Sequence, residues 1–197
     1  KLWKARGSKV NGPALADWWR QIDAWKARNC LAYRRSDTII KPQYAIERLE
    51  ALTRDHDRYI TTEVGQHQMW AAQFLHFQGP NRWMTSGGLG TMGYGLPASV
   101  GVQVAHPEAL VINVAGDASW LMNMQEMGTA TQYRLPVKQF ILNNERLGMV
   151  RQWQELLHGE RYSSSWSESL PDFVKLAEAF GCKGALVKDP KNLDDAI

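Results

Sequence analysis

Two polar segments of the chain could together hold a divalent cation. Gly116-Asp117 and Asn143-Asn144 each follow a short apolar run, and 25 residues (118–142) separate them. This spacing suits one strand–helix–strand unit, which would bring both strand ends to the same edge of a parallel sheet. A carboxylate and an amide carbonyl are oxygen ligands of the kind that Mg²⁺ takes, with room left for water and phosphates. The alternative is that Asp117 caps a helix and the asparagines form a turn.

A glycine cluster at 87–95 contains the pattern GxGxxG at Gly88, Gly90 and Gly93, with Glu108 twenty residues after the first glycine. This pattern is also found in dinucleotide-binding folds, where a strand precedes it. The segment before the cluster, 80–85, is a poor strand because it is short and flanked by proline. The glycines would equally let the backbone approach an anion or a flat ring.

The elements that must position these residues alternate between strand and helix. Repeated alternation predicts an α/β fold with a doubly wound parallel sheet flanked by helices. Ligands of such sheets bind outside the carboxyl ends of the strands. The expected strands are 59–62, 110–114, 139–142 and 184–187, and the expected helices between them are 91–105, 121–133 and 171–180.

The N-terminal part is expected to lie outside this sheet. Residues 1–12 have the composition of a linker, and Pro13 opens a helix with apolar side chains at three-to-four spacing, namely Leu15, Trp18, Trp19, Ile22 and Trp25. A second helix, 42–54, would turn Ile46, Leu49 and Leu52 to one face. We therefore divide the chain into 1–41, a linker and N-terminal helix, and 42–197, the ligand-binding domain.

Composition excludes several classes of protein. With 197 residues, 44% apolar side chains and 2 cysteines, the chain can form an ordinary globular core. It has neither a membrane-length apolar run nor a signal-peptide pattern, which predicts a cytosol-like compartment. Residues 1–58 carry 13 basic and 7 acidic side chains, but these are interspersed, so we do not expect nucleic-acid binding. Cys30 and Cys182 lie in no metal or redox motif.

The Gly-Asp to Asn-Asn spacing resembles the signature of thiamine diphosphate enzymes. Three further segments, 63–73, 85–93 and 147–153, resemble the catalytic subunit of the acetolactate synthase family. The resemblance begins near residue 42 and corresponds to the family's C-terminal cofactor-binding domain. It implies thiamine diphosphate and Mg²⁺ as cofactors, with FAD bound by another domain of the full-length enzyme.

The resemblance also implies roles for individual residues. Asp117 and Asn144 would bind Mg²⁺ through their side chains, and Arg146 through its backbone carbonyl. Met92 would press on the cofactor between its two rings, with Gly90 as a pyrimidine contact; core packing is the other interpretation of this methionine. The diphosphate would be held by Val64, Gly65, Gln66, His67, Gly116, Asp117, Ala118, Ser119, Gly148 and Met149. The substrate entrance would be formed by Met149, Val150, Gln152 and Trp153, although a lone tryptophan usually belongs to a core.

The implied reaction is decarboxylation of pyruvate and its joining to a second 2-ketoacid, pyruvate or 2-ketobutyrate, in branched-chain amino acid biosynthesis. Ala118 stands where the signature usually has glycine. This difference should not affect binding if the diphosphate contacts only the backbone amide of this residue. The glutamate that activates the cofactor is expected on the N-terminal domain of a partner subunit, so we place no catalytic residue in this chain and reject Glu63 for that role. The same resemblance implies a homodimer or homotetramer, a small regulatory subunit, and a cytoplasmic or organellar location.

Three alternatives remain open at this stage. The chain could come from another thiamine diphosphate carboligase or decarboxylase, such as a glyoxylate carboligase or a pyruvate oxidase-like protein, although segment 147–153 favours acetolactate synthase. It could be a non-catalytic assembly module that uses the tryptophan-rich helix. It could also be a dinucleotide-binding domain.

Overall fold

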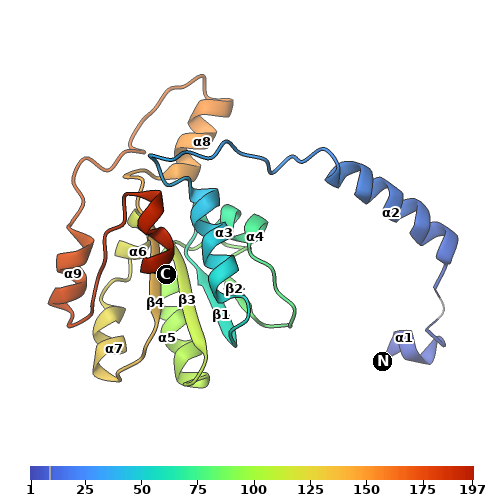
Figure 1. Ribbon diagram of the computed structural model, residues 1–197, viewed down its shortest axis with the longest axis horizontal. Helices are drawn as coiled ribbons and strands as arrows, with labels where there is room; N and C mark the ends of the chain where they lie inside the picture. Colours follow the sequence, from blue (N-terminus) through green and yellow to red (C-terminus); the bar gives the residue numbers. More distant parts are fainter. Residues whose placement is uncertain (9) are drawn as a thin grey trace. The chain divides into compact units, whose positions relative to one another are not determined.

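A four-stranded parallel sheet forms the centre of the fold and confirms the predicted α/β class. The computed structural model describes residues 1–8 and 10–197. The strands run in the order β2-β1-β3-β4 (Figure 1). Their bounds are Arg58–Thr62 for β1, Trp83–Thr85 for β2, Leu110–Gly116 for β3 and Lys138–Leu142 for β4. Gly116 of β3 pairs with Leu142 of β4, so the predicted neighbouring strand ends are confirmed.

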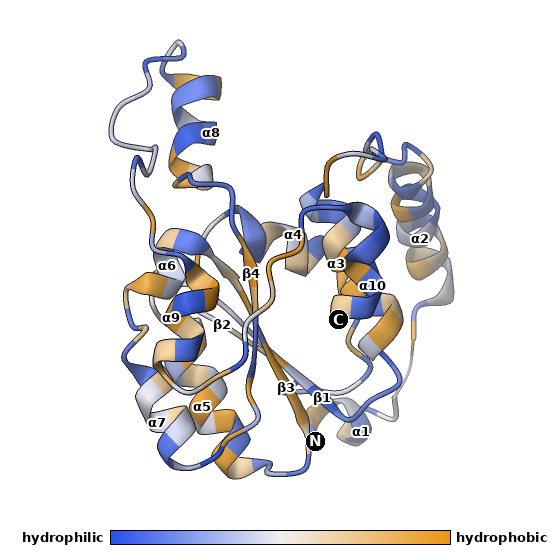
Figure 2. Ribbon diagram, turned by 60° about the vertical axis from the view of Figure 1, so that its left-hand side comes forward, coloured by the Kyte–Doolittle hydropathy of each residue, from blue (hydrophilic) through white to orange (hydrophobic). Residues whose placement is uncertain are grey.

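Helices cover both faces of the sheet, as a doubly wound fold requires. Side chains of β3 alternate, with Ile112 and Val114 in one core and Ala115 in the other. Figure 2 shows the two helix layers on opposite sides of the strands. One layer contains α3 (Pro42–Thr53), α4 (Gln66–Phe74) and α10 (Leu193–Ala196). The other contains α5 (Gly95–Ala105), α6 (Asp117–Leu121), α7 (Glu126–Gln132) and α9 (Phe173–Ala179).

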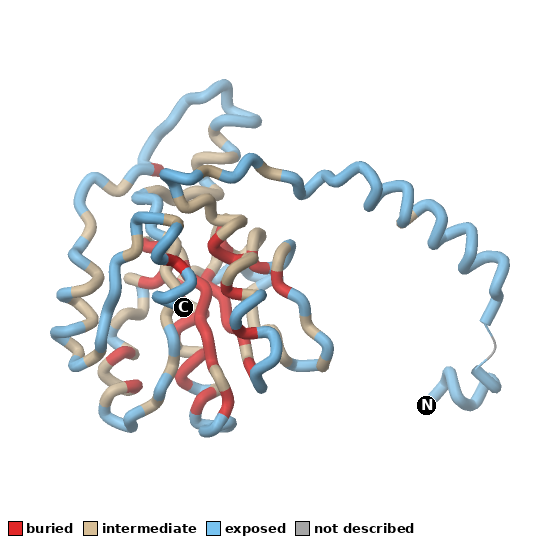
Figure 3. The backbone as a smooth tube through the Cα atoms, in the orientation of Figure 1, coloured by how far each residue is buried: buried red, intermediate tan, exposed pale blue. Residues whose placement is uncertain are grey.

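Burial is concentrated in the strands and in the helix faces turned toward them (Figure 3). Of the three apolar residues expected on one face of α3, Ile46 and Leu49 are buried, whereas Leu52, in the last turn, is exposed. Asp172 caps α9, since its carboxylate accepts hydrogen bonds from Val174 N and Lys175 N. No helix among the described residues is long and apolar enough to cross a membrane.

Several predicted elements differ from the structure. The helix expected at 91–105 begins only at Gly95. The helix expected at 121–133 forms only from Glu126, as α7, and a separate helix, α6, ends at Leu121. Two further helices, α4 and α8 (Gly148–Leu157), were not predicted. The strand expected at 184–187 was wrong: this segment joins no ladder in the described part of the chain, and Leu186 is 67% exposed.

The chain divides into two compact units, Lys1–Arg34 and Arg35–Ile197. The predicted linker contains a short helix, α1 (Leu2–Ala5), and Lys9 lies outside the described residues. The predicted tryptophan-rich helix is confirmed as α2 (Gly12–Lys26). A boundary at residue 42 between domains of a longer protein stays a prediction.

Candidate functional site

A pocket of about 200 Å³ lies at the carboxyl ends of β1, β3 and β4, where parallel sheets bind their ligands. Four stretches of chain form it: the start of α4, the glycine-rich turn before α5, the start of α6, and the loop that leads into α8. Gln152, expected at the substrate entrance, does not line this pocket. The expected site residues that do line it are Val64, Gly65, Gln66, His67, Gly90, Met92, Gly116, Asp117, Ala118, Ser119, Asn144, Arg146, Gly148, Met149, Val150 and Trp153. Three further residues line the pocket and were not predicted: Trp70, Leu142 and Leu147.

Asp117 ties the end of β3 to the loop after β4. Its side chain is buried, with 1% of the residue exposed. One carboxylate oxygen accepts from Ala118 N at 2.5 Å, and the other accepts from Asn144 N at 3.1 Å and Glu145 N at 2.6 Å. Burial raises the pKa of Asp117, while these backbone hydrogen bonds act to lower it. The carboxylate therefore fixes the turn that carries the other expected metal ligands.

The turn at 144–146 is also held from a distant part of the chain. Within the turn, Asn144 Oδ1 accepts a hydrogen bond from Arg146 N at 3.2 Å. From the distant segment, the ring centre of Trp166 lies 5.4 Å from the Arg146 guanidinium. Leu147 N donates to Ser165 O at 2.9 Å, in line with an antiparallel bridge between Arg146 and Trp166. No group of three or more His, Cys, Asp or Glu side chains in the described ranges could hold a metal. The expected ligand set differs, because it needs one carboxylate, one amide and one backbone carbonyl.

The His67 ring fills a space between two glycines. A Cβ on Gly65 would lie 2.7 Å from His67 Cε1, and a Cβ on Gly116 would lie 2.7 Å from Nδ1. Burial lowers the pKa of His67 to about 4, although a hydrogen bond to the Glu63 backbone acts to raise it. Nε2 is buried and has no hydrogen-bond partner among the residues that the structure describes. A buried unpaired nitrogen on a pocket wall suits a site whose ligand supplies the missing partner.

Helix α8 lies against the start of α4 at the edge of the pocket. Gln66 Nε2 donates to Gln152 Oε1 at 3.2 Å, and a Cβ on Gly148 would overlap Gln66 Oε1. Trp153, which lies on the same helix, is 55% exposed, so it does not take the alternative role of a core residue. The α8 residues are therefore positioned at the pocket opening by contacts with α4.

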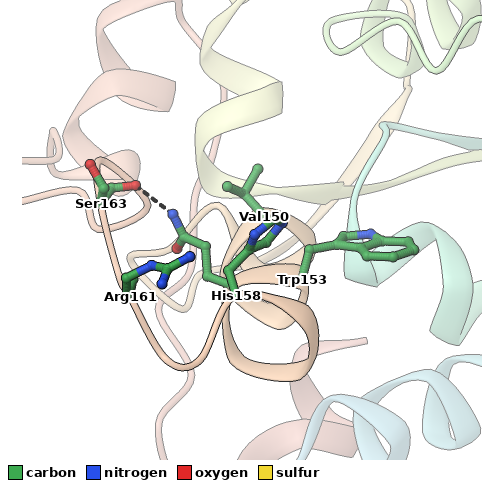
Figure 4. A pocket seen from close by; sticks show the side chains of 6 residues that line it. Val150, Trp153, His158, Arg161 and Ser163 are labelled. Atoms are coloured by element: carbon green, nitrogen blue, oxygen red, sulfur yellow. Dashed lines mark hydrogen bonds between the residues drawn. The ribbon is translucent and has the colours of Figure 1, made fainter.

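A second, open cavity of about 630 Å³ lies on the outer side of α8. It shares Val150 and Trp153 with the strand-end pocket and adds Gln154, His158, Arg161 and Ser163. Figure 4 shows the indole of Trp153 pointing away from Arg161 and Ser163. Gln154 Nε2 donates to Ser163 O at 2.8 Å, which joins α8 to the loop that follows it.

Glu63 is not in the pocket wall. It is fully buried, and its two carboxylate oxygens accept from Gly93 N at 2.7 Å and Leu96 N at 2.9 Å. Burial raises the pKa of Glu63, and the backbone N–H groups of residues 93–96 act to lower it. The acid thus binds the N-terminal turn of α5, which agrees with its rejection as a group that acts on the cofactor.

Comparison with known proteins agrees with this site. Residues 63–197 match the family described as "Thiamine pyrophosphate enzyme, C-terminal TPP binding domain". The chain is 52% identical over 183 residues to the acetolactate synthase isozyme 3 large subunit of Escherichia coli (strain K12). It is 50% identical over 184 residues to the acetolactate synthase large subunit of Pyropia yezoensis.

These alignments cover 93% of this chain and 32% and 31% of the two relatives, so the chain spans about a third of their length. The family match, by contrast, covers well over half of the chain and includes every residue that lines the pocket. Thiamine pyrophosphate and thiamine diphosphate are two names for the same cofactor. The chain belongs to the thiamine pyrophosphate enzymes, and its residues 63–197 are a C-terminal TPP-binding domain of that family.

Proposed function

We propose that the chain is the cofactor-binding part of an acetolactate synthase large subunit, and that the strand-end pocket binds thiamine diphosphate with Mg²⁺. The observation that carries this proposal is the convergence of four stretches of chain on one pocket that holds a buried carboxylate and an unpaired buried nitrogen. The sequence identity of about 50% to acetolactate synthase large subunits supports the assignment of the acetolactate synthase reaction.

In this proposal Asp117 and Asn144 bind Mg²⁺ through side-chain oxygens, and Arg146 through its carbonyl. The diphosphate is held at the first turns of α4, α6 and α8, where backbone N–H groups without helical partners favour an anion. His67 forms a hydrogen bond to the same ligand through Nε2. Gly90 and Met92 contact the ring portion. When bound, the cofactor supplies the electron sink that decarboxylation of a 2-ketoacid needs.

The substrate contacts proposed for α8 are Met149, Val150 and Trp153. All three line the pocket, and Val150 and Trp153 are exposed, as a surface that meets an incoming 2-ketoacid must be. Pyruvate and 2-ketobutyrate differ by one methylene, a difference that an apolar contact can discriminate by about 1–3 kcal/mol. We therefore assign the choice of the second substrate to these side chains.

The activating acid is proposed to come from a partner subunit. Of the described residues that line the pocket, Asp117 is the sole carboxylate, and its oxygens accept from three backbone N–H groups. A site completed by a second chain requires a homodimer or homotetramer. FAD and a small regulatory subunit are assigned to surfaces outside this chain, and a cytoplasmic or organellar location stays a prediction.

The alternatives receive less support. A glyoxylate carboligase or pyruvate oxidase-like enzyme would share the pocket, but the relatives at 48–52% identity are acetolactate synthases. A non-catalytic assembly module would not need the buried Asp117. A dinucleotide site is disfavoured because α5 begins at Gly95, after the glycine pattern, and β2 is only three residues long.

A product assay on the full-length protein tests the proposal. With pyruvate, thiamine diphosphate and Mg²⁺, we expect acetolactate, and loss of at least about 100-fold in rate for Asp117→Asn. The matched control is Asp172→Asn, which changes an exposed helix-capping carboxylate on α9 and should leave the rate unchanged within about twofold. Consumption of glyoxylate in place of 2-ketoacids, or full activity of Asp117→Asn, would contradict the proposal.

A further inference from the structure

The glycine-rich turn before α5 contributes Gly90 and Met92 to the pocket wall, yet it belongs to no helix or strand. Gly90 and Gly93 have φ angles of +67° and +84°, in the left-handed region that favours glycine. A turn of this kind has few hydrogen bonds of its own to fix its conformation. Its position must therefore come from side chains of other elements.

Two side chains hold the backbone of Gly93 from opposite sides. Its N–H donates to Glu63 Oε2 at 2.7 Å, and its carbonyl accepts from Asn123 Nδ2 at 2.6 Å. A Cβ on Gly93 would lie 2.8 Å from Asn123 Nδ2, so the close approach of this amide depends on glycine. Glu63 follows β1, and Asn123 lies between α6 and α7, so the turn is fixed to two elements that are distant in the sequence.

The neighbouring hydrogen bonds hold the ends of the same turn. Thr91 N donates to Ser86 Oγ at 2.9 Å on the side of β2. On the side of α5, the second oxygen of Glu63 accepts from Leu96 N at 2.9 Å. A buried carboxylate can satisfy several N–H groups at once and binds each more strongly than a neutral acceptor does. Glu63 thus joins the turn rigidly to the first turn of α5.

We propose that Glu63 and Asn123 are positioning residues that clamp Gly93 and so hold Met92 and Gly90 in the pocket wall for the cofactor. Neither side chain lines the pocket, so both act through the turn. The inference rests on the proposed binding of thiamine diphosphate in this pocket. It extends that proposal by assigning roles to two residues outside the set expected from the sequence.

The test compares Glu63→Gln and Asn123→Ala with Gln103→Leu in the full-length protein. Glutamine cannot accept at both oxygen positions, so one N–H of the turn loses its partner. Gln103 is buried at the other end of α5, where Nε2 donates to the carbonyls of His106, Pro107 and Ala109, each at 3.1 Å. It is the matched control, because its loss perturbs the same helix without touching the turn.

The test has three readouts. They are amide hydrogen exchange of residues 90–96 without cofactor, the melting temperature, and the calorimetric Kd of thiamine diphosphate at fixed Mg²⁺. The clamp variants should exchange faster at Gly93 and bind the cofactor at least about tenfold more weakly, as expected when supporting residues are lost. Gln103→Leu should lower the melting temperature and leave the Kd within about twofold. Asn123 is only half-buried, so Asn123→Ala tests the clamp even if Glu63→Gln does not fold.

The outcomes separate this inference from the proposed function. If wild-type protein binds the cofactor and both folded clamp variants bind equally well, the clamp is refuted and the proposed function stands. An equal loss of affinity in Gln103→Leu would also refute the clamp, since general destabilisation of α5 would then suffice. A wild-type protein that binds no cofactor would overturn both.

Discussion

Protonation of His67 should destabilise the native chain at mildly acidic pH. In the folded state burial lowers the pKa of this ring from the ordinary 6.5 to about 4. Between these two pH values the unfolded chain binds a proton that the native chain does not. The free energy of unfolding should therefore fall as the pH falls from 6.5 to about 4, whereas above 6.5 His67 contributes no pH dependence.

The size of this effect follows from the difference between the two pKa values. Each tenfold change in proton affinity corresponds to about 1.4 kcal/mol, so His67 should account for a loss of about 3 kcal/mol across the window. The carboxyl groups of Glu63 and Asp117, whose pKa values are raised, act in the opposite direction. Their contribution is removed by comparing variants that differ only at the histidine.

The assay is denaturant unfolding at about pH 7.5 and about pH 4.5 of the wild type, His67→Gln and His56→Gln. Glutamine does not titrate, so His67→Gln should lose about 2–3 kcal/mol less than the wild type between these pH values. His56 is exposed, and His56→Gln serves as the matched control. Equal pH dependence of the wild type and His67→Gln would refute the reasoning, as would an imidazole titration midpoint near 6.5 by NMR.

Other substitutions test the packing of α5 and the role of α8. In Gly95→Ala the new Cβ would lie 2.6 Å from the backbone N of Glu63 and 2.7 Å from the carbonyl carbon of Thr62. We therefore expect the free energy of unfolding to fall by about 3 kcal/mol or more. Gly101→Ala on the same helix meets open space and should instead stabilise the fold by about 0.5–1 kcal/mol. Trp153→Ala removes an exposed side chain, so its unfolding free energy should change by less than about 1 kcal/mol while the ratio of products from pyruvate and 2-ketobutyrate changes. A large loss of stability with an unchanged product ratio would contradict the role given to Trp153.

The strand ends could be predicted because local signals agree there. Apolar runs, turn residues and the spacing from Gly116 to Asn143 all indicate one strand–helix–strand unit, and Gly116 does pair with Leu142. The predicted strand at 184–187 has the same local composition but no neighbouring strand in the described structure to complete a ladder. An apolar run by itself therefore does not determine whether a strand forms.

The supporting contacts of the site could not be predicted because their partners are far apart in the sequence. Glu63 and Gly93 are joined across 30 residues, and the antiparallel bridge from Arg146 to Trp166 crosses 20. Sequence alone identified Glu63 as an acid beside the site, but only the fold shows that its oxygens bind the turn before α5. The glycines on either side of His67 likewise come from two different strand ends.

The most direct test of the central claim is calorimetric titration of the full-length protein with thiamine diphosphate, with and without Mg²⁺, for the wild type and Asp117→Ala. We predict saturable binding by the wild type that requires Mg²⁺, and loss of this binding in Asp117→Ala. Absence of binding to the wild type, or equal binding to Asp117→Ala, would contradict the assignment of the strand-end pocket to this cofactor.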